Sequence, residues 1–224
     1  MRNPFSSLNK LEWGLYILSL SLVGLSYALS QSGFLSFIAS LIGVTALIFV
    51  AKGDVFGQVM TVVFALFYAY ISLRFRYYGE MITYLGMTAP MAVMAVISWV
   101  KNPYKGTREV RVASLGARHF AWVGVFTAAV TAIFYFILSA LETPNLFFST
   151  ISVTTSFAAS ALTFLRSPYY ALAYAANDVV LIVLWVLASL TDISYIPMII
   201  CFAAFLINDV YGFINWTKMK SRQT

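Results

Sequence analysis

The sequence has little charge and almost no cysteine or histidine. Asp, Glu, Lys and Arg together make up 10% of its 224 residues, against about 25% in an average soluble domain. The single cysteine, Cys201, permits no intramolecular disulfide, and one cysteine with one histidine cannot supply a zinc cluster. We therefore expect neither a disulfide-stabilised domain nor a metal centre, and we expect no cofactor.

Signatures of enzymes are also missing. The chain contains no His-Glu-x-x-His, no nucleophile elbow and no phosphate-binding loop. One enzyme alternative is an intramembrane aspartyl protease, which needs two facing carboxylates, and Asp178 and Asp209 could supply them. Each of these follows an Asn and no known protease signature surrounds it. The sequence therefore favours a protein that is not an enzyme.

Apolar residues are abundant and lie in long runs. They make up 61% of the chain, and the mean hydropathy is +0.85. A soluble domain of this length could not hide so much apolar surface in one core. A membrane helix needs about 20 mainly apolar residues. The sequence predicts an all-α integral membrane protein with eight transmembrane helices, over residues 12–29, 34–51, 55–73, 81–100, 120–141, 146–165, 169–190 and 194–216.

The charge that is present is basic, with 14 Lys and Arg against 8 Asp and Glu. In a soluble protein this balance would suggest a nucleic-acid partner, but Lys and Arg collect on the cytoplasmic loops of membrane proteins. With eight helices, twelve of the fourteen fall on one side, and only Arg74 and Arg76 on the other. We expect a multi-pass protein of the cell membrane with both termini cytoplasmic, and no nucleic-acid partner. A signal peptide is the alternative for the first helix, because Ala28-Leu29-Ser30 imitates a cleavage site.

A weak internal repeat relates two groups of three helices. In each group a basic residue, Lys52 or Arg166, ends the first helix, and the third helix ends in Trp-x-Lys at Trp99 or Trp216. Two such groups are parallel only if one helix links them. Parallel repeats with a site between them are typical of transporters. The sequence predicts a 3+1+3 core with a leading helix in 1–33, repeats in 34–100 and 142–218, a basic cytoplasmic loop in 101–119, a linking helix in 120–141 and a tail in 219–224.

Polar side chains deep in the predicted helices mark a candidate site, because such groups are costly in a membrane. Asn177 and Asp178 lie near the middle of one helix and Asn208 lies in the next. Helical spacing places Tyr170, Tyr174, Asp178 and Trp185 on one face, and Asn208, Tyr211 and Asn215 on another. Aromatic walls with amide groups suit a small planar ring that carries a polar part. The alternative is that the Asn side chains only bond to neighbouring helices.

Several short segments resemble the PnuC-type vitamin transporters. The resemblance covers most of residues 34–218 and rests on the order and spacing of Ala51-Lys52-Gly53, Tyr77-Tyr78-Gly79-Glu80, Pro90, Trp99-Val100-Lys101-Asn102, Tyr174-Ala-Ala-Asn-Asp, Leu206-Ile-Asn-Asp, Tyr211-Gly212 and Trp216. It implies a core related to the SWEET sugar transporters and assembly as a homotrimer. It also implies facilitated uptake of nicotinamide riboside, a precursor of NAD, which phosphorylation then traps inside. Relatives carry thiamine, riboflavin or deoxynucleosides, which remain alternatives.

The resemblance also bears on the site residues. The family often has Trp-x-x-x-Asn in the second helix of each repeat. Asn177 matches that Asn but Ala173 replaces the Trp, and in the first repeat the matching places fall near Met60 and Phe64. Asn208 matches a recurrent Asn of the last helix. The substrate-binding residues expected from the pattern and the resemblance together are Asn177, Asn208, Asp178, Tyr174, Gln58 and Trp185.

Overall fold

The structure of the protein is a computed structural model that describes residues 3–30, 34–74, 78–191, 193 and 196–224. Apart from two isolated bridges between loop residues, the described chain is helical. The elements in chain order are η1 (Pro4–Ser7), α1 (Lys10–Ser30), α2 (Phe34–Ala51), α3 (Val55–Arg74), α4 (Tyr78–Thr83), η2 (Tyr84–Thr88), α5 (Ala89–Val100), α6 (Ala117–Ala140), α7 (Leu146–Phe164), α8 (Tyr170–Ser189) and α9 (Ile196–Gln223).

The predicted all-α membrane architecture is confirmed. Seven helical segments of the described chain are long and apolar enough to cross a membrane, and the described apolar part of α2, Phe37–Ala51, is shorter than that limit. Large apolar side chains point outward, including Phe126 and Phe136 on α6 and Leu66 on α3. In water such a surface would be unfavourable, but lipid tails solvate it. The bilayer is therefore the partner of this outer surface.

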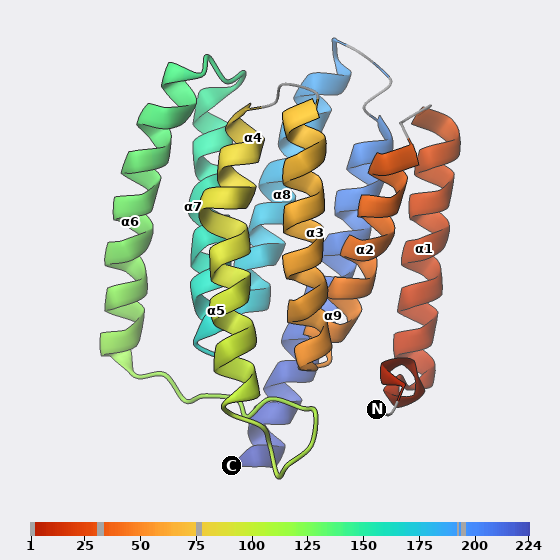
Figure 1. The fold of residues 1–224 in the computed structure, drawn as a ribbon, viewed down its shortest axis with the longest axis vertical. Helices are drawn as coiled ribbons and strands as arrows, with labels where there is room; N and C mark the ends of the chain where they lie inside the picture. Colours follow the sequence, from red (N-terminus) through yellow and green to blue (C-terminus); the bar gives the residue numbers. More distant parts are fainter. Residues whose placement is uncertain (1–2, 31–33, 75–77, 192, 194–195) are drawn as a thin grey trace.

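Six helices form a closed ring. Contacts run from α2 to α3, α5, α7, α8, α9 and back to α2. The two remaining long helices lie outside the ring, α1 against α2 and α9, and α6 against α7 (Figure 1). Each helix of the ring contacts two others, so the ring is closed. A closed ring can surround a path across the membrane, and α1 and α6 lie outside it.

The predicted helix 81–100 contains an irregularity that the hydropathy pattern did not indicate. It starts at Tyr78 and passes through the π-helical turn η2 before continuing as α5. In this turn the N–H of Ala89 donates to the carbonyl of Tyr84, five residues back. Pro90 follows directly, and a proline ring clashes with the carbonyl four residues before it. The wider turn accommodates Pro90 without breaking the helix.

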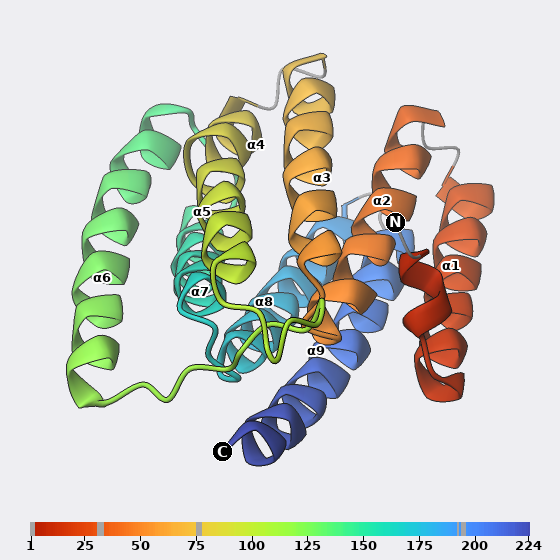
Figure 2. The same cartoon turned by 60° about the horizontal axis from the view of Figure 1, so that its bottom comes forward.

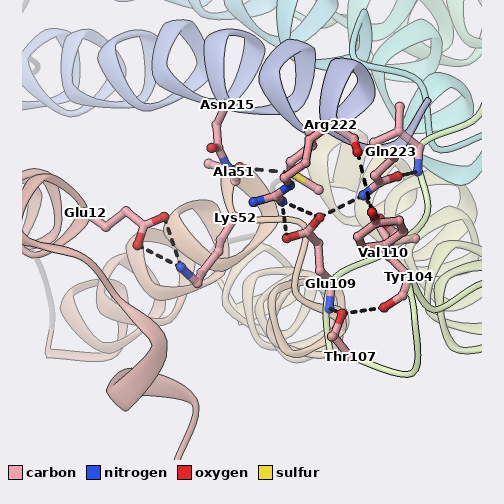
Figure 3. Close-up of polar contacts among 12 residues, drawn as sticks. Glu12, Ala51, Lys52, Tyr104, Thr107, Glu109, Val110, Asn215, Arg222 and Gln223 are labelled. Carbon is pink, nitrogen blue, oxygen red and sulfur yellow. Dashed lines mark hydrogen bonds and ion pairs between the residues drawn. The ribbon is translucent and has the colours of Figure 1, made fainter.

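The end of the molecule that carries both termini is closed by a loop (Figures 1 and 2). Glu109 in this loop pairs with Arg222 at 2.6 Å and accepts a hydrogen bond from Gln223 at 2.8 Å (Figure 3). Gln223 also donates to the carbonyl of Val110. These contacts hold the last turns of α9, which extends to Gln223 rather than ending near 216 as expected. The expected tail is therefore largely helical.

The leading helix α1 is attached to the ring by a buried carboxylate. Glu12 is 2% exposed. It pairs with Lys52 at 2.9 Å (Figure 3) and accepts a hydrogen bond from the Tyr211 hydroxyl at 2.9 Å. Glu12 and Asn9 also cap α1, because each side chain accepts from the other residue's backbone N–H. One side chain thus joins α1 to α2 and α9.

Candidate functional site

Two tryptophans connect the halves of the ring in a reciprocal way, where the first half is α2, α3 and α5 and the second half is α7, α8 and α9. Trp99 at the end of α5 donates from Nε1 to the carbonyl of Thr163, the next-to-last residue of α7, at 2.9 Å. Trp216 of α9 donates from Nε1 to the carbonyl of Val50, the next-to-last residue of α2, at 3.0 Å. Both rings are fully buried, and their centroids are 5.2 Å apart. Each third helix thus bonds to the first helix of the other half.

The neighbouring residues repeat this exchange. Ser98 Oγ donates to the carbonyl of Phe164, which ends α7, and Asn215 Nδ2 donates to the carbonyl of Ala51, which ends α2 (Figure 3). The turns that follow also correspond, because Gly53 and Arg166 both adopt positive φ. The ends of α2 and α7 therefore share the same kinds of contact and the same turn geometry.

The loop after α5 bonds to both of these turns. The N–H of Val110 donates to the carbonyl of Gly53, and the N–H of Ala113 donates to the carbonyl of Arg166. Burial lowers the pKa of the Arg166 guanidinium, and the charge of Arg111 lowers it further. An arginine pKa starts far enough above neutrality for the charge to remain. The two halves are therefore held together at this end of the molecule.

A small cavity lies between the two halves, with an empty volume of about 210 Å³ including its opening. Helices α3 and α5 and the turn η2 of the first half, and α7 and α8 of the second half, provide its walls. The side chains that line it are Gln58, Thr61, Thr88, Met91, Ala92, Ala95, Ser160, Thr163 and Tyr174. The walls combine hydroxyl groups, one amide, one aromatic ring and apolar surface, the usual composition of a small-molecule site.

Two of the predicted site residues line the cavity. Gln58 is 3% exposed, and its side-chain amide has no hydrogen bond to any described residue. Because Gln58 lines the cavity, its amide can bind a ligand there. The hydroxyl of Tyr174 is hydrogen-bonded to Ser160 at 3.1 Å across the α7–α8 interface. The ring is thereby fixed in the cavity wall.

Asn177 uses one of its two polar side-chain atoms to bond to a neighbouring helix. Its Oδ1 accepts hydrogen bonds from Ser152 at 3.1 Å and from Thr155 at 2.9 Å, both on α7. Both bonds use the same oxygen, and among the described residues none accepts from Nδ2. Asn177 thus joins α8 to α7 while half of its hydrogen-bonding capacity is unused.

Asp178 faces Asp209 across the α8–α9 interface. Both side chains are buried and hydrogen-bond to each other. Oδ2 of Asp178 is buried without a hydrogen-bond partner, and no Lys or Arg of the described chain pairs with either carboxyl. Two carboxyl groups can hydrogen-bond only if a proton lies between them. The sequence singled out both residues but did not predict that they meet.

Asn208 lies away from the cavity. Its Nδ2 donates to Ser19 Oγ on α1 at 2.8 Å and to the carbonyl of Ala204 at 2.8 Å. Tyr211 bonds to Glu12 and Asn215 to Ala51, so the polar face predicted on this helix contacts α1 and α2. Trp185 is half-buried farther along α8 and does not line the cavity.

Sequence reasoning missed most of the cavity wall. Thr61, Thr88, Ser160 and Thr163 contribute hydroxyl groups, and Ala92 and Ala95 make room. Small and hydroxyl residues are common at helix interfaces in membranes, so their presence in an apolar run does not identify a site. Spacing offered one usable signal, because Gln58 and Thr61 share a face of α3.

Comparison with known proteins identifies the family. A model of the family described as "Nicotinamide mononucleotide transporter" matches residues 33–218. The chain belongs to this family. The match confirms the resemblance stated from the sequence and runs from α2 to all but the last residues of α9, but it leaves out the whole of α1. A transporter family, rather than an enzyme family, is therefore the context in which the cavity is interpreted.

Individual relatives agree with this assignment. The chain is similar to the "Nicotinamide riboside transporter PnuC" of Neisseria mucosa, with 25% identity covering 93% of this chain and 81% of the relative. It is 24% identical to the protein of the same name from Haemophilus influenzae, covering 88% and 85%. The crystal structure of "the Vitamin B3 transporter PnuC" superposes with a TM-score of 0.81 at 24% identity, covering 97% of this chain and 95% of that one.

Proposed function

We propose that the protein carries nicotinamide riboside across the cell membrane by facilitated diffusion, and that phosphorylation inside the cell then traps it. The observation that carries this proposal is the cavity between the two halves of the ring, with Gln58 and Tyr174 in its wall. The names of the relatives support the choice of substrate.

The chemistry of the wall suits this substrate. Nicotinamide riboside has a flat pyridinium ring with a carboxamide, and a ribose with hydroxyl groups. The Tyr174 ring offers a stacking surface, and the Gln58 amide can both donate and accept. Thr61, Thr88 and Ser160 can bond ribose hydroxyl groups. Asp178 follows Tyr174 by one turn on the same face of α8, and its buried Oδ2 has no hydrogen-bond partner among the described residues.

The volume indicates a closed conformation. The free space inside the cavity is about 10 Å³, room for about one water molecule, whereas pockets that hold drug-sized ligands measure about 300–1,000 Å³. Trp99 and Trp216 hold the two halves together at the end with the termini. We propose that the halves separate there to admit or release substrate.

The reciprocal tryptophan contacts favour the SWEET-like 3+1+3 arrangement. We propose repeats in 34–100 and 142–218, with α6 as the linking helix, α1 as an extra helix and α2 as the eighth crossing. The positive charges predict that the end with the termini is cytoplasmic. The family resemblance favours a homotrimer. Tags after residues 1, 77 and 224, and the mass of the purified complex, test the topology and the trimer.

The experiment that tests the function is titration of the purified protein with nicotinamide riboside, thiamine, riboflavin and deoxynucleosides. We expect saturable binding of nicotinamide riboside, and we expect uptake into proteoliposomes to stop at equal concentrations without an ion gradient. Binding of another nucleoside or vitamin alone would favour the alternative substrates. Accumulation driven by sodium or protons would reject facilitated diffusion, and Asp178 would then be the first residue to examine for ion binding.

A further inference from the structure

An aromatic cluster lies beyond the cavity, toward the end of the molecule opposite the termini. It consists of Phe64 and Tyr68 on α3 and Tyr84 in η2. The ring centroids of Tyr68 and Tyr84 are 4.6 Å apart, and those of Phe64 and Tyr84 are 5.9 Å apart and edge-to-face. All three rings are partly accessible. A cluster of this kind offers faces that attract flat and cationic groups.

A carboxylate that makes no ion pair with any described residue lies next to the cluster. Glu80 of α4 accepts hydrogen bonds from Ser72 at 3.5 Å and from the Tyr68 hydroxyl. Its side chain is exposed, and it makes no ion pair with a described residue. The hydroxyl donors orient the carboxylate without neutralising its charge. The negative charge is therefore available to a positively charged ligand.

The cluster is continuous with the cavity. Thr61 of the cavity wall lies seven residues before Tyr68 on α3, so the two share a helix face. Thr88 of the wall ends the π-helical turn that begins at Tyr84. Tyr84 also interacts electrostatically with both Glu80 and Tyr174. Wide helical turns are frequent at functional sites, and this one lies between Glu80 and the cavity.

We propose that Glu80, Tyr68 and Tyr84 form a second site, which holds the cationic aromatic ring of the substrate before it enters the cavity. The proposal rests on the proposed function, because nicotinamide riboside carries a pyridinium charge. The carboxylate selects for the positive charge and the tyrosine rings select for a flat group. Gln58 and the hydroxyl groups of the cavity do not distinguish a charged ring from a neutral one.

The test compares nicotinamide riboside with its reduced form, which has nearly the same shape and no ring charge. We expect Glu80→Gln to weaken binding of the charged form about fivefold or more and of the reduced form less than about twofold. Tyr84→Leu should also affect the charged form more, whereas Tyr84→Phe should change little. Gln58→Ala is the control and should weaken both forms equally. Equal effects of Glu80→Gln on the two forms would overturn the proposal.

The site formed by Glu80, Tyr68 and Tyr84 can also be tested if the substrate is not nicotinamide riboside. If the wild-type protein binds neither form, the proposed substrate is wrong, and the same variants are titrated with thiamine, whose thiazolium ring is a cation. Loss of thiamine binding in Glu80→Gln and Tyr84→Leu would support the site. Binding of neutral nucleosides only, or of no compound tested, would overturn it.

Discussion

The two halves of the ring have corresponding tryptophan contacts and positive-φ turns, but they carry different side chains at corresponding positions. Counting from the positive-φ residues Gly53 and Arg166, Ala65 of the first half and Asp178 of the second both lie twelve residues on. Counting back from the two tryptophans, Ala92 and Asp209 both lie seven residues before. Where the first half has two alanines, the second has two carboxyl groups. At these matched positions the first half is apolar and the second half carries carboxyl groups.

The cavity wall shows the same asymmetry. Thr61 and Tyr174 occupy corresponding places, eight residues after Gly53 and Arg166, and both line the cavity. One contributes a hydroxyl group and the other a large ring. Corresponding halves with unlike walls can hold a ligand whose two ends differ, such as a nucleoside.

The largest effect is expected from placing a carboxyl group in the first half. Ala65 is fully buried, and an Asp near the centre of a membrane helix costs about 3 kcal/mol. Ala65→Asp should therefore prevent stable folding, as measured by expression and by thermal unfolding in detergent. Ala65→Ser is the matched control and should fold. Wild-type stability in Ala65→Asp would show that the first half tolerates charge as well as the second.

The next effect concerns the unlike walls. Tyr174→Ala removes a stacking surface worth about 1–3 kcal/mol, so affinity for the substrate should fall about 5- to 150-fold. Calorimetric titration measures this change. Tyr174→Phe should lose less, since the ring remains. Tyr135→Ala on the outer face of α6, where the side chain is exposed, provides a control that should bind normally. Unchanged affinity in Tyr174→Ala would place the binding site elsewhere.

The corresponding contacts of the two halves predict equal effects from the two tryptophans. Trp99→Phe and Trp216→Phe each remove one N–H donor from a carbonyl that keeps a backbone partner, the N–H of Arg166 at Thr163 and the N–H of Gly53 at Val50, so each should cost about 0.5–1.5 kcal/mol. Thermal unfolding should therefore shift by similar amounts in the two variants. A large shift in one variant and none in the other would contradict the correspondence of the halves.

The smallest effect is expected at Asn208. Its hydrogen bond to Ser19 joins α9 to α1, and interhelical hydrogen bonds of this kind average about 0.6 kcal/mol in membranes. Asn208→Ala and Ser19→Ala should each lower thermal stability slightly, and the double variant should lose no more than the larger single effect. Substrate affinity serves as the second measurement. A fivefold loss of affinity in Asn208→Ala, without a similar loss in Ser19→Ala, would show that Asn208 binds the substrate.

The helices could be predicted from the sequence because the constraint that produces them is local. A segment that crosses a bilayer must satisfy its own backbone hydrogen bonds and present apolar side chains to lipid, so hydropathy found the helix positions to within a few residues, except that α9 continues to Gln223. The order of short segments also indicated the family. Pro90 was visible in the sequence, but the π-helical turn before it was not predicted.

The site was only partly predictable, because the rotation of each helix is decided by its neighbours. Gln58 and Asn208 are both polar residues in apolar runs, yet one lines the cavity and the other bonds to α1. Periodicity grouped Asp178 with Tyr174 but could not show that Asp209 faces it from α9. The sequence by itself determined which segments enter the membrane and which polar residues they carry. Only the closed ring decided which of those residues meet each other and which meet the cavity, since a polar group in a membrane takes whichever partner the packing provides.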